Sequence, residues 1–242
     1  MSNEKYELIP LPWDTDYFGV SSARVNLHAS VGEAGQAEIL NFCKDYEFVT
    51  ISNIGNISEN NHWIGNKTNA FLADVNIQFI KDLAEEAGYK DDKSFVETSL
   101  SRNEQILDIA KNSFHYSRFF NDPKLPEEQA RNLYLHWTEC AFGQEDKYFA
   151  ISEKDEKIAG FILFHVEEGS CVIELIAVDE KYQGQGVGKS LIRSMEAFAI
   201  AIGIEETKVG TQVNNISAAN FYSAMGFKCA SCGSMYHLWR KK

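Results

Sequence analysis

The chain has 242 residues and a formal net charge of −12, with 44% hydrophobic and 24% charged residues. This length allows one large domain or two small ones, and the composition is typical of globular proteins. The acidic balance disfavours non-specific binding to nucleic acid or to an anionic membrane surface. We therefore expect neither as a partner, and an anionic ligand must be held by local cations and backbone amides.

No run of residues is long and apolar enough for a transmembrane helix, and Met1–Lys5 lack the apolar run of a signal peptide. The sequence therefore predicts a cytoplasmic protein. Cys229 and Cys232 form a Cys-x-x-Cys pair, but no second pair accompanies them, so we expect no metal. The other three cysteines lie in apolar surroundings and are predicted to be small core residues: Cys43, Cys140 and Cys171.

The first part of the chain is predicted to contain both helix and strand. Apolar residues at helical spacing predict a helix over Glu33–Tyr46, and short apolar runs predict strands at Phe48–Ile51 and Phe71–Val75. The segment Leu11–Gly19 is aromatic and rich in turn formers, which indicates a specific site or a packing corner. The stretch Glu85–Lys93 is polar and acidic, so we place a domain boundary there, with domains at 1–95 and 96–242.

The second part is predicted to begin with two helices, one at Gln105–Ala110 after a cap at Ser101 or Asn103, and one at Glu127–Ala141. Three strands with hairpin-like connections follow, at Tyr148–Ser152, Ile158–Val166 and Cys171–Val178. The chain then continues with a helix to about Ala201, a strand at Thr207–Val213, a helix at Asn215–Ala224 and a strand near Met235–Trp239.

A glycine-rich turn separates the apolar strand that ends at Val178 from the helix that follows. Its spacing is Gln183-x-x-Gly186-x-Gly188. Glycines let a backbone approach a phosphate closely, and the first free N–H groups of the helix point at that phosphate. The spacing differs from that of the nucleotide P-loop and of the dinucleotide fingerprint. The turn is therefore predicted to hold a phosphate group; a turn without a ligand is the alternative.

A second block lies about thirty residues downstream. Asn215 is expected to cap a short helix there, and Gly226 to end it in the left-handed conformation. The glycine-rich turn resembles the acetyl-CoA pyrophosphate loop of the GNAT acyltransferase superfamily, and the second block resembles another GNAT pattern. An ordinary capped helix with a core tyrosine is the alternative for this block. The positions that match the second pattern are Asn215, Ala218, Phe221, Tyr222, Gly226 and Phe227.

This resemblance implies an α+β GNAT acyltransferase fold, with a mixed, mostly antiparallel sheet flanked by helices and an additional N-terminal α/β domain that is an incomplete GNAT-like unit. The predicted β-β-β-α-β-α-β order is the order of a GNAT core. The resemblance also implies an N-acetyltransferase that uses acetyl-CoA as its acyl donor and no metal. The residues expected to contact acetyl-CoA are Ile176, Ala177, Val178, Gln183, Gly184, Gln185, Gly186, Val187, Gly188, Lys189, Asn215, Asn220 and Tyr222.

Two further blocks, Trp13–Gly19 and Phe114–Phe119 with the later Tyr134-x-x-Trp137, resemble the bacterial dTDP-fucosamine acetyltransferase group. That resemblance implies an acceptor between the two domains, namely the primary amine of a nucleotide-linked amino-deoxy sugar, and leaves a homodimer open. A GNAT acting on a protein N-terminus, a polyamine or an antibiotic, and a non-catalytic acetyl-CoA-binding module, remain alternatives. The residues expected to bind the acceptor are His115, Tyr116 and Arg118, with Arg131 nearby.

Proton transfer needs an acid for the departing thiolate and a base for the amine. Tyr222 is expected to be the acid, as carried over from the family motif. Glu174 is one candidate base, because strand alternation predicts that it shares a face with Ile176 and Val178. His165 on the adjacent strand is another, because histidine titrates near neutral pH, and an ordered water chain is the third. The alternative for Arg118 is a surface ion pair.

Overall fold

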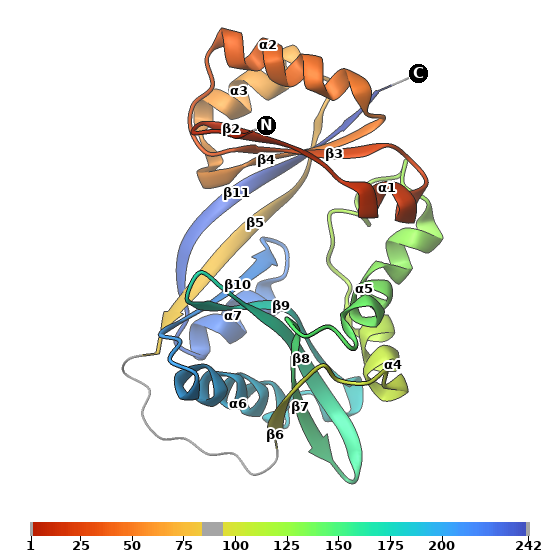
Figure 1. The fold of residues 1–242 in the computed structure, drawn as a ribbon, viewed down its shortest axis with the longest axis vertical. Helices are drawn as coiled ribbons and strands as arrows, with labels where there is room; N and C mark the ends of the chain where they lie inside the picture. The colour runs from red at the N-terminus through yellow and green to blue at the C-terminus, as the bar shows by residue number, and fades with distance from the viewer. Residues whose placement is uncertain (1, 84–93, 241–242) are drawn as a thin grey trace.

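A computed structural model describes residues 2–83 and 94–240 of the chain. The described strands form one sheet, in which the long strands β5 and β11 run from the upper half of the molecule into the lower half (Figure 1). In sheet order the strands are β1 (Ser2–Asn3), β2 (Tyr6–Pro10), β3 (Ser22–Leu27), β4 (Phe48–Asn53), β11 (Lys228–Trp239), β5 (Phe71–Asp82), β10 (Glu206–Gln212), β9 (Ser170–Val178), β8 (Lys157–Glu167), β7 (Tyr148–Lys154) and β6 (Ser94–Thr98).

The helices cover both faces of this sheet (Figure 1). The α-helices are α1 (Pro12–Phe18), α2 (Glu33–Phe42), α3 (Ser58–Lys67), α4 (Glu104–Ser113), α5 (Glu127–Ala141), α6 (Val187–Ala201) and α7 (Ile216–Ala224), and the short 3-10 helices are η1 (Cys43–Asp45), η2 (Ile54–Asn56) and η3 (Glu180–Tyr182). None of the described helices is both long and apolar enough to cross a membrane.

The upper half has its own core. β3 alternates buried Ala23, Val25 and Leu27 with partly exposed polar residues, as a strand with one covered face does. These three side chains pack with Ile39 of α2 and Ile64 of α3. The opposite face of β3 therefore points away from α2 and α3.

The lower half follows the predicted order, as β7, β8, β9, α6, β10, α7 and β11. Two tight hairpins join its first three strands: Asp155 and Glu156 in one, and Glu168 and Gly169 in the other, all have positive φ. The core cluster around Leu191 of α6 lies on one face of these strands, and the cluster around Ile106 of α4 lies on the other. The predicted fold class is confirmed.

Several predicted elements extend beyond their expected ends or differ in detail. β5 and β11 each have 12 residues, because each pairs with a strand on both sides, which the local sequence pattern does not reveal. The segment expected to be rich in turns contains the helix α1, which begins with Pro12 in its first turn. Cys140 is exposed on α5 and is not a core residue, whereas Cys43 and Cys171 are buried.

The expected boundary at residue 95 stays a prediction, and the acidic stretch Glu85–Lys93 lies outside the described residues. The sheet itself runs across this boundary, because β11 from the end of the chain lies between β4 and β5. The two halves are therefore joined by continuous backbone pairing.

Candidate active site

The glycine-rich turn forms a cradle at the start of α6. Gly184 and Gly186 have φ of 72° and 84°, a region that other residues rarely adopt, and Gly186 is the N-cap of α6. No described side chain caps this helix, and its first turn carries no acidic residue. The first N–H groups of α6 are therefore available to an anion and are not repelled by a nearby carboxylate.

The strands next to the cradle diverge. β9 and β10 pair in parallel from Ser170 and Glu206 as far as Ile173 and Val209, and the pairing stops there although both strands continue. Among the described strands, the β9 backbone from residue 174 to residue 178 therefore has no partner on this side. Such an edge offers N–H and C=O groups to a ligand that lies along it.

A cavity of about 490 Å³ lies at the point where the cradle and the diverging strand meet. It brings together eleven of the thirteen residues expected to contact acetyl-CoA, from β9, the turn, α6 and α7. Its lining residues are Ile176, Ala177, Val178, Tyr182, Gln183, Gly184, Gly186, Val187, Gly188, Lys189, Asn215, Ser217, Ala218, Phe221 and Tyr222.

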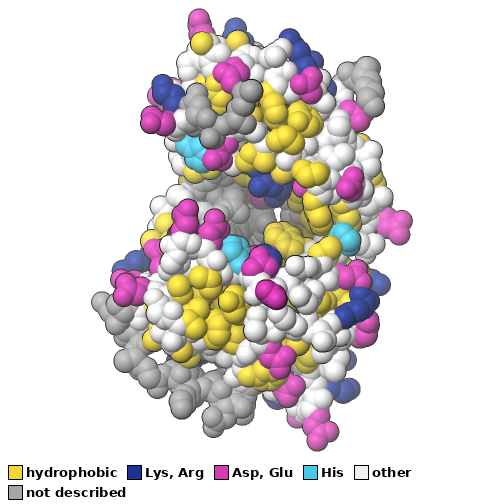
Figure 2. All heavy atoms as spheres, viewed as in Figure 1, with side chains coloured by type: hydrophobic (Ala, Val, Ile, Leu, Met, Phe, Trp, Pro, Cys, Tyr) yellow, Lys and Arg dark blue, Asp and Glu magenta, His cyan; other side chains and the backbone are white. Residues whose placement is uncertain are grey.

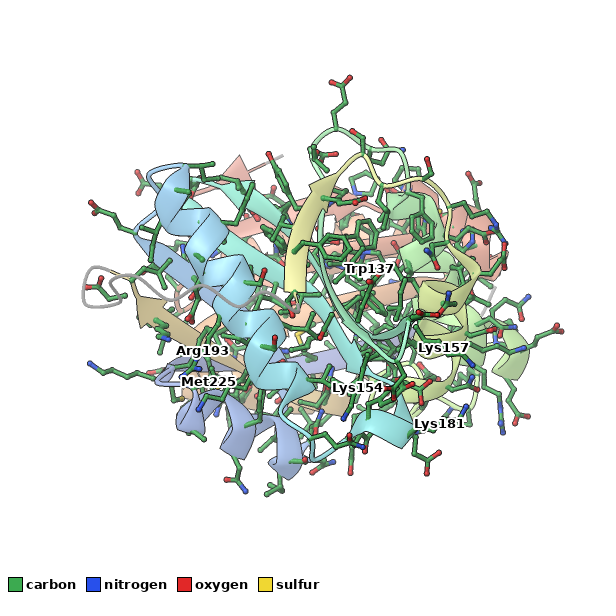
Figure 3. The ribbon with its side chains drawn as sticks, turned by 90° about the horizontal axis from the view of Figure 1, so that it is seen from below. Trp137, Lys154, Lys157, Lys181, Arg193 and Met225 are labelled. Carbon is green, nitrogen blue, oxygen red and sulfur yellow. The ribbon has the colours of Figure 1, made fainter. Side chains whose placement is uncertain are left out.

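The other two predicted contacts lie outside this cavity. The Gln185 side chain donates to the carbonyl of Lys181 at 2.8 Å, accepts from Lys154 and lines a neighbouring cavity. Figure 3 shows Lys154 and Lys181 near the N-terminal end of α6. Asn220 is exposed on α7. The roles of Gln185 and Asn220 in binding stay predictions.

The close approach of α7 to the cradle explains why residue 188 is a glycine. A Cβ at Gly188 would lie 3.2 Å from the Phe221 ring, which is tighter than ordinary van der Waals contact. Asn215 caps α7 by accepting from the N–H of Ala218 at 3.2 Å, and Gly226 ends that region at φ 88°, both as predicted. The two motif blocks therefore meet in space.

Tyr222 lines this cavity. Its side chain is buried and packs against the rings of Phe79, Phe221 and Phe227. Burial raises the pKa of the Tyr222 phenol above its usual range, so the hydroxyl stays protonated at neutral pH. The residue can therefore donate a hydrogen bond or a proton at this point.

Glu174 occupies a β-bulge. Leu163 of β8 pairs with Leu175 and Phe164 pairs with Ile173, so Glu174 is the extra residue of β9. Both of its carboxylate oxygens have partners. His165 Nδ1 lies 2.6 Å from Oε1, to which Lys147 also donates, and Trp137 Nε1 donates to Oε2 at 2.9 Å.

The bulge corrects the predicted face of Glu174. It reverses the side-chain alternation, so Ile176 and Val178 pack against the cluster around α6, whereas Glu174 contacts Trp137 of α5 on the other face. His165 does lie beside Glu174, as adjacent strands allow. Lys147 and Trp137 were not anticipated as partners, because no local signal links residues so far apart in sequence.

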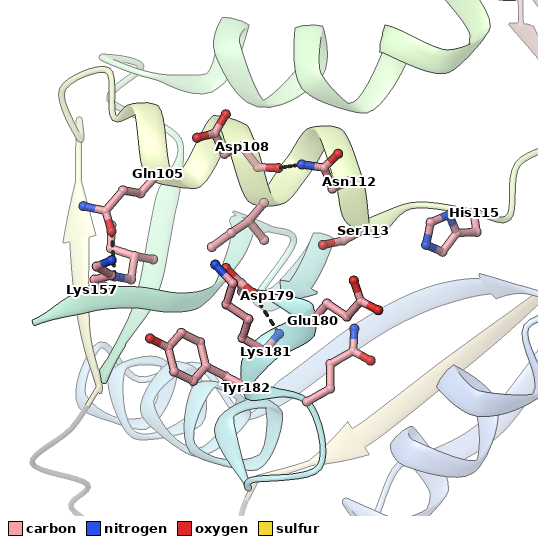
Figure 4. Close-up of a pocket in the computed structure, with 13 residues that line it drawn as sticks. Gln105, Asp108, Asn112, Ser113, His115, Lys157, Asp179, Glu180, Lys181 and Tyr182 are labelled. Atoms are coloured by element: carbon pink, nitrogen blue, oxygen red, sulfur yellow. Dashed lines mark hydrogen bonds between the residues drawn. The ribbon is translucent and has the colours of Figure 1, made fainter. Parts of the chain in front are cut away.

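The three predicted acceptor residues do not form one cluster. His115 lines a cavity of about 1020 Å³ between α4 and η3, where Figure 4 shows it beyond the end of α4. Tyr116 is exposed, and its carbonyl accepts from the Tyr134 hydroxyl at 3.3 Å. Arg118 is half-buried and stacks on the Phe119 ring, 4.1 Å from its centroid. Arg131 is an exposed partner of Glu127 within α5.

The described residues include no group of His, Cys, Asp and Glu side chains that would hold a metal ion. They do suit coenzyme A. The cradle supplies free N–H groups without an acidic residue, and the unpaired edge of β9 leads from the cradle toward Tyr222. These features would hold a pyrophosphate and an extended amide-bearing arm, respectively.

Residues 104–227 match the acetyltransferase (GNAT) family. The chain belongs to this family. The GNAT family uses acetyl-CoA as acyl donor, in agreement with the fit of the cradle and strand edge. The match spans α4 to the start of β11 and so includes both motif blocks.

Individual relatives extend this finding. Spore coat polysaccharide biosynthesis protein SpsD of Bacillus subtilis (strain 168) is 24% identical over 139 residues, which cover 57% of this chain and 48% of SpsD. The chain thus spans about half the length of this relative. A functionally unknown conserved protein from Staphylococcus epidermidis ATCC 12228 has a TM-score of 0.69 at 12% identity, over 100% of this chain and 93% of that one. A GCN5-related N-acetyltransferase from Sphaerobacter thermophilus has a TM-score of 0.63 at 12% identity, over 97% of this chain and 76% of that one.

Proposed function

We propose that the chain is an acetyl-CoA-dependent N-acetyltransferase whose acceptor is the primary amine of a nucleotide-linked amino-deoxy sugar. The observation that carries the donor half of this proposal is the cavity that joins the cradle, the diverging edge of β9 and Tyr222. The family match supports the same half.

Donor binding would use backbone more than side chains. The N–H groups at the start of α6 face the pyrophosphate, and the helix N-terminus adds favourable charge. The pantetheine arm would lie along β9 at Ile176–Val178, where no described strand competes for the backbone on the β10 side. A backbone N–H of the same stretch would donate to the thioester carbonyl oxygen.

The transfer removes two protons from the amine nitrogen and adds one proton to sulfur. An alkylammonium group must first lose a proton, because only the neutral amine attacks. The new C–N bond forms as the C–S bond breaks, the acylated nitrogen loses its second proton to become an amide, and the electron pair leaves on sulfur, which takes a proton. Glu174, which is hydrogen-bonded to His165, would accept the amine proton, and His165 also contacts Glu167 at 3.2 Å on the way to solvent. Tyr222 would donate to the sulfur.

Two features support a nucleotide sugar as acceptor. SpsD is named for polysaccharide biosynthesis. In the region between the halves, the rings of Trp13, Tyr17 and His136 stack with centroids 4.8 to 5.5 Å apart, and Trp13 is 41% exposed. An exposed aromatic face of this kind can stack on a base or a sugar ring.

The test is thiol release from acetyl-CoA with dTDP-4-amino-4,6-dideoxygalactose, a UDP-amino sugar, spermidine and a short peptide as acceptors. We expect turnover with the dTDP sugar, and a loss of at least about 100-fold in Tyr222→Phe. Tyr46→Phe is the matched control, since Tyr46 packs in the upper core, far from the cavity. Turnover with spermidine or the peptide alone would refute the acceptor assignment.

A further inference from the structure

Buried polar atoms without a partner gather in one place. Four buried side-chain nitrogen or oxygen atoms among the described residues make no hydrogen bond, and three of them are Nε of Arg24, Nε of Arg118 and Nε2 of His237. The strand register pairs Arg24 of β3 with Thr50 of β4, and Thr50 with His237 of β11, so Arg24 and His237 lie in one row on the same face of the sheet. Arg118 stacks on the Phe119 ring, whose centroid lies 6.2 Å from that of His237. Buried donors are normally satisfied, so a cluster of unsatisfied ones needs a reason.

The two arginines come from different halves of the molecule. Arg24 lies on β3, on the face opposite Ala23 and Val25, and so points away from α2 and α3. Arg118 lies between α4 and α5, with its guanidinium over Phe119. Figure 2 shows a hollow between the two halves, with basic side chains in it.

No described carboxylate forms an ion pair with either guanidinium. Burial and the charge of Arg24 lower the pKa of Arg118 to about 10, so the two cations oppose each other in a place of limited solvation. Asp14 of α1 and Asp74 of β5 are near enough to act on Arg118, but no described salt bridge joins them to it. Their charges offset part of the repulsion and leave the guanidinium edges open.

We propose that Arg24 and Arg118 together form an anion subsite, and that it holds the diphosphate of the acceptor nucleotide. The identity of this anion rests on the proposed function. Two guanidinium groups suit a diphosphate because each presents a planar set of donors to phosphate oxygens. The acidic chain as a whole repels anions, so this pair supplies the local positive charge that such an acceptor needs.

The subsite gives the upper half a role in specificity. β3 carries no residue of the donor cavity, yet it places Arg24 opposite a residue of the lower half. An amine without an anionic group would leave both guanidinium groups unpaired and would bind less well.

The test is calorimetric titration of the full chain, saturated with coenzyme A to fill the cradle, with inorganic pyrophosphate and with dTDP. We expect Arg24→Gln and Arg118→Gln each to weaken both ligands at least about tenfold, with Arg131→Gln unchanged because Arg131 is exposed and paired within α5. Asp14→Asn is expected to tighten both ligands, since it removes a competing negative charge. A loss of structure would not produce that gain.

Thermal unfolding checks that each variant is folded. Arg24→Lys is a second control, because lysine keeps the positive charge of arginine but lacks its planar set of donors. Wild-type binding of dTDP in Arg24→Gln and Arg118→Gln would overturn the subsite, whatever the enzyme acetylates. Loss of binding in both, with no turnover of any nucleotide sugar, would keep the subsite and refute the proposed acceptor.

Discussion

Replacing the cradle glycines with alanine tests the need for their backbone conformation alone, because there is space for the added Cβ. Gly184 and Gly186 have positive φ, and a Cβ added at either position would meet no atom within 4 Å. Gly203, just beyond the end of α6, has φ 78° and is equally open. Gly184→Ala, Gly186→Ala and Gly203→Ala therefore impose the same backbone strain, but only the first two lie at the donor cavity.

The strain sets the expected loss of stability. A residue other than glycine in the left-handed region costs about 1–2 kcal/mol. For a chain of this size, that corresponds to roughly 2–8 °C in Tm for each of the three variants. If the turn relieves the strain by rotating, the N–H groups at the start of α6 move away from the pyrophosphate. Each charge-assisted hydrogen bond lost costs about 1.5–3 kcal/mol, or roughly 10- to 150-fold in Kd.

Calorimetric titration with coenzyme A and thermal unfolding measure the two effects separately. We expect all three variants to lose similar Tm, but only Gly184→Ala and Gly186→Ala to bind coenzyme A more weakly. Wild-type affinity in both cradle variants, or an equal loss of affinity in Gly203→Ala, would refute the cradle reasoning.

Three further changes test other parts of the molecule. Glu174→Gln should lower kcat at neutral pH by about 10²–10⁴-fold if Glu174 accepts the amine proton, and an unchanged kcat–pH profile would exclude that role. Lys81→Met should cost about 3–5 kcal/mol in urea unfolding, because it leaves the buried Glu196 carboxylate, 2.8 Å from Lys81 Nζ, without this cation; full recovery of stability is expected only when Glu196→Leu is added. Burial would raise the pKa of Asp122, but hydrogen bonds from His237 and Trp239 lower it, and burial lowers the pKa of His237. The stabilising effect of His237 is therefore complete above about pH 6.5 and is lost as the pH falls below that value, whereas the effect of Asp122 is lost only as the pH falls below about 4. Because the hydrogen bond with Asp122 raises the pKa of His237, Asp122→Asn should lower that pKa further and increase the loss of unfolding free energy between about pH 6.5 and pH 4, and a flatter profile would contradict it.

Local signals predicted the donor side of the molecule well. The glycine spacing, the Asn215 cap and Gly226 each specify conformation within a few residues, so the turn and α7 form where expected. The lengths of β5 and β11 were not predictable in this way. Asn76 and Gln78 in β5 are polar, and they lie in a strand because β10 and β11 supply backbone partners on both sides.

The proposed acceptor subsite depends on contacts between distant residues. Arg24 faces Arg118 only because β3 joins the sheet that β11 extends into the upper half. Nothing in the local sequence around Arg24 distinguishes it from a solvent-exposed strand residue. From the sequence, one arginine of the pair, Arg118, was therefore proposed through its motif block, and Arg24 was not proposed.

A single extra residue in β9 accounts for both the core packing and the position of the candidate base. Without the bulge, Ile173 and Leu175 would share a face; with it, Ile173 packs toward α6 and Leu175 toward α4. The pairing of β9 with β10 also stops at Ile173, immediately before the bulge. The residue that reverses the alternation thus lies where the strand edge becomes free for a ligand. Deleting Glu174 would disturb the core and the edge together, so the conservative change to glutamine is the variant that isolates its chemistry.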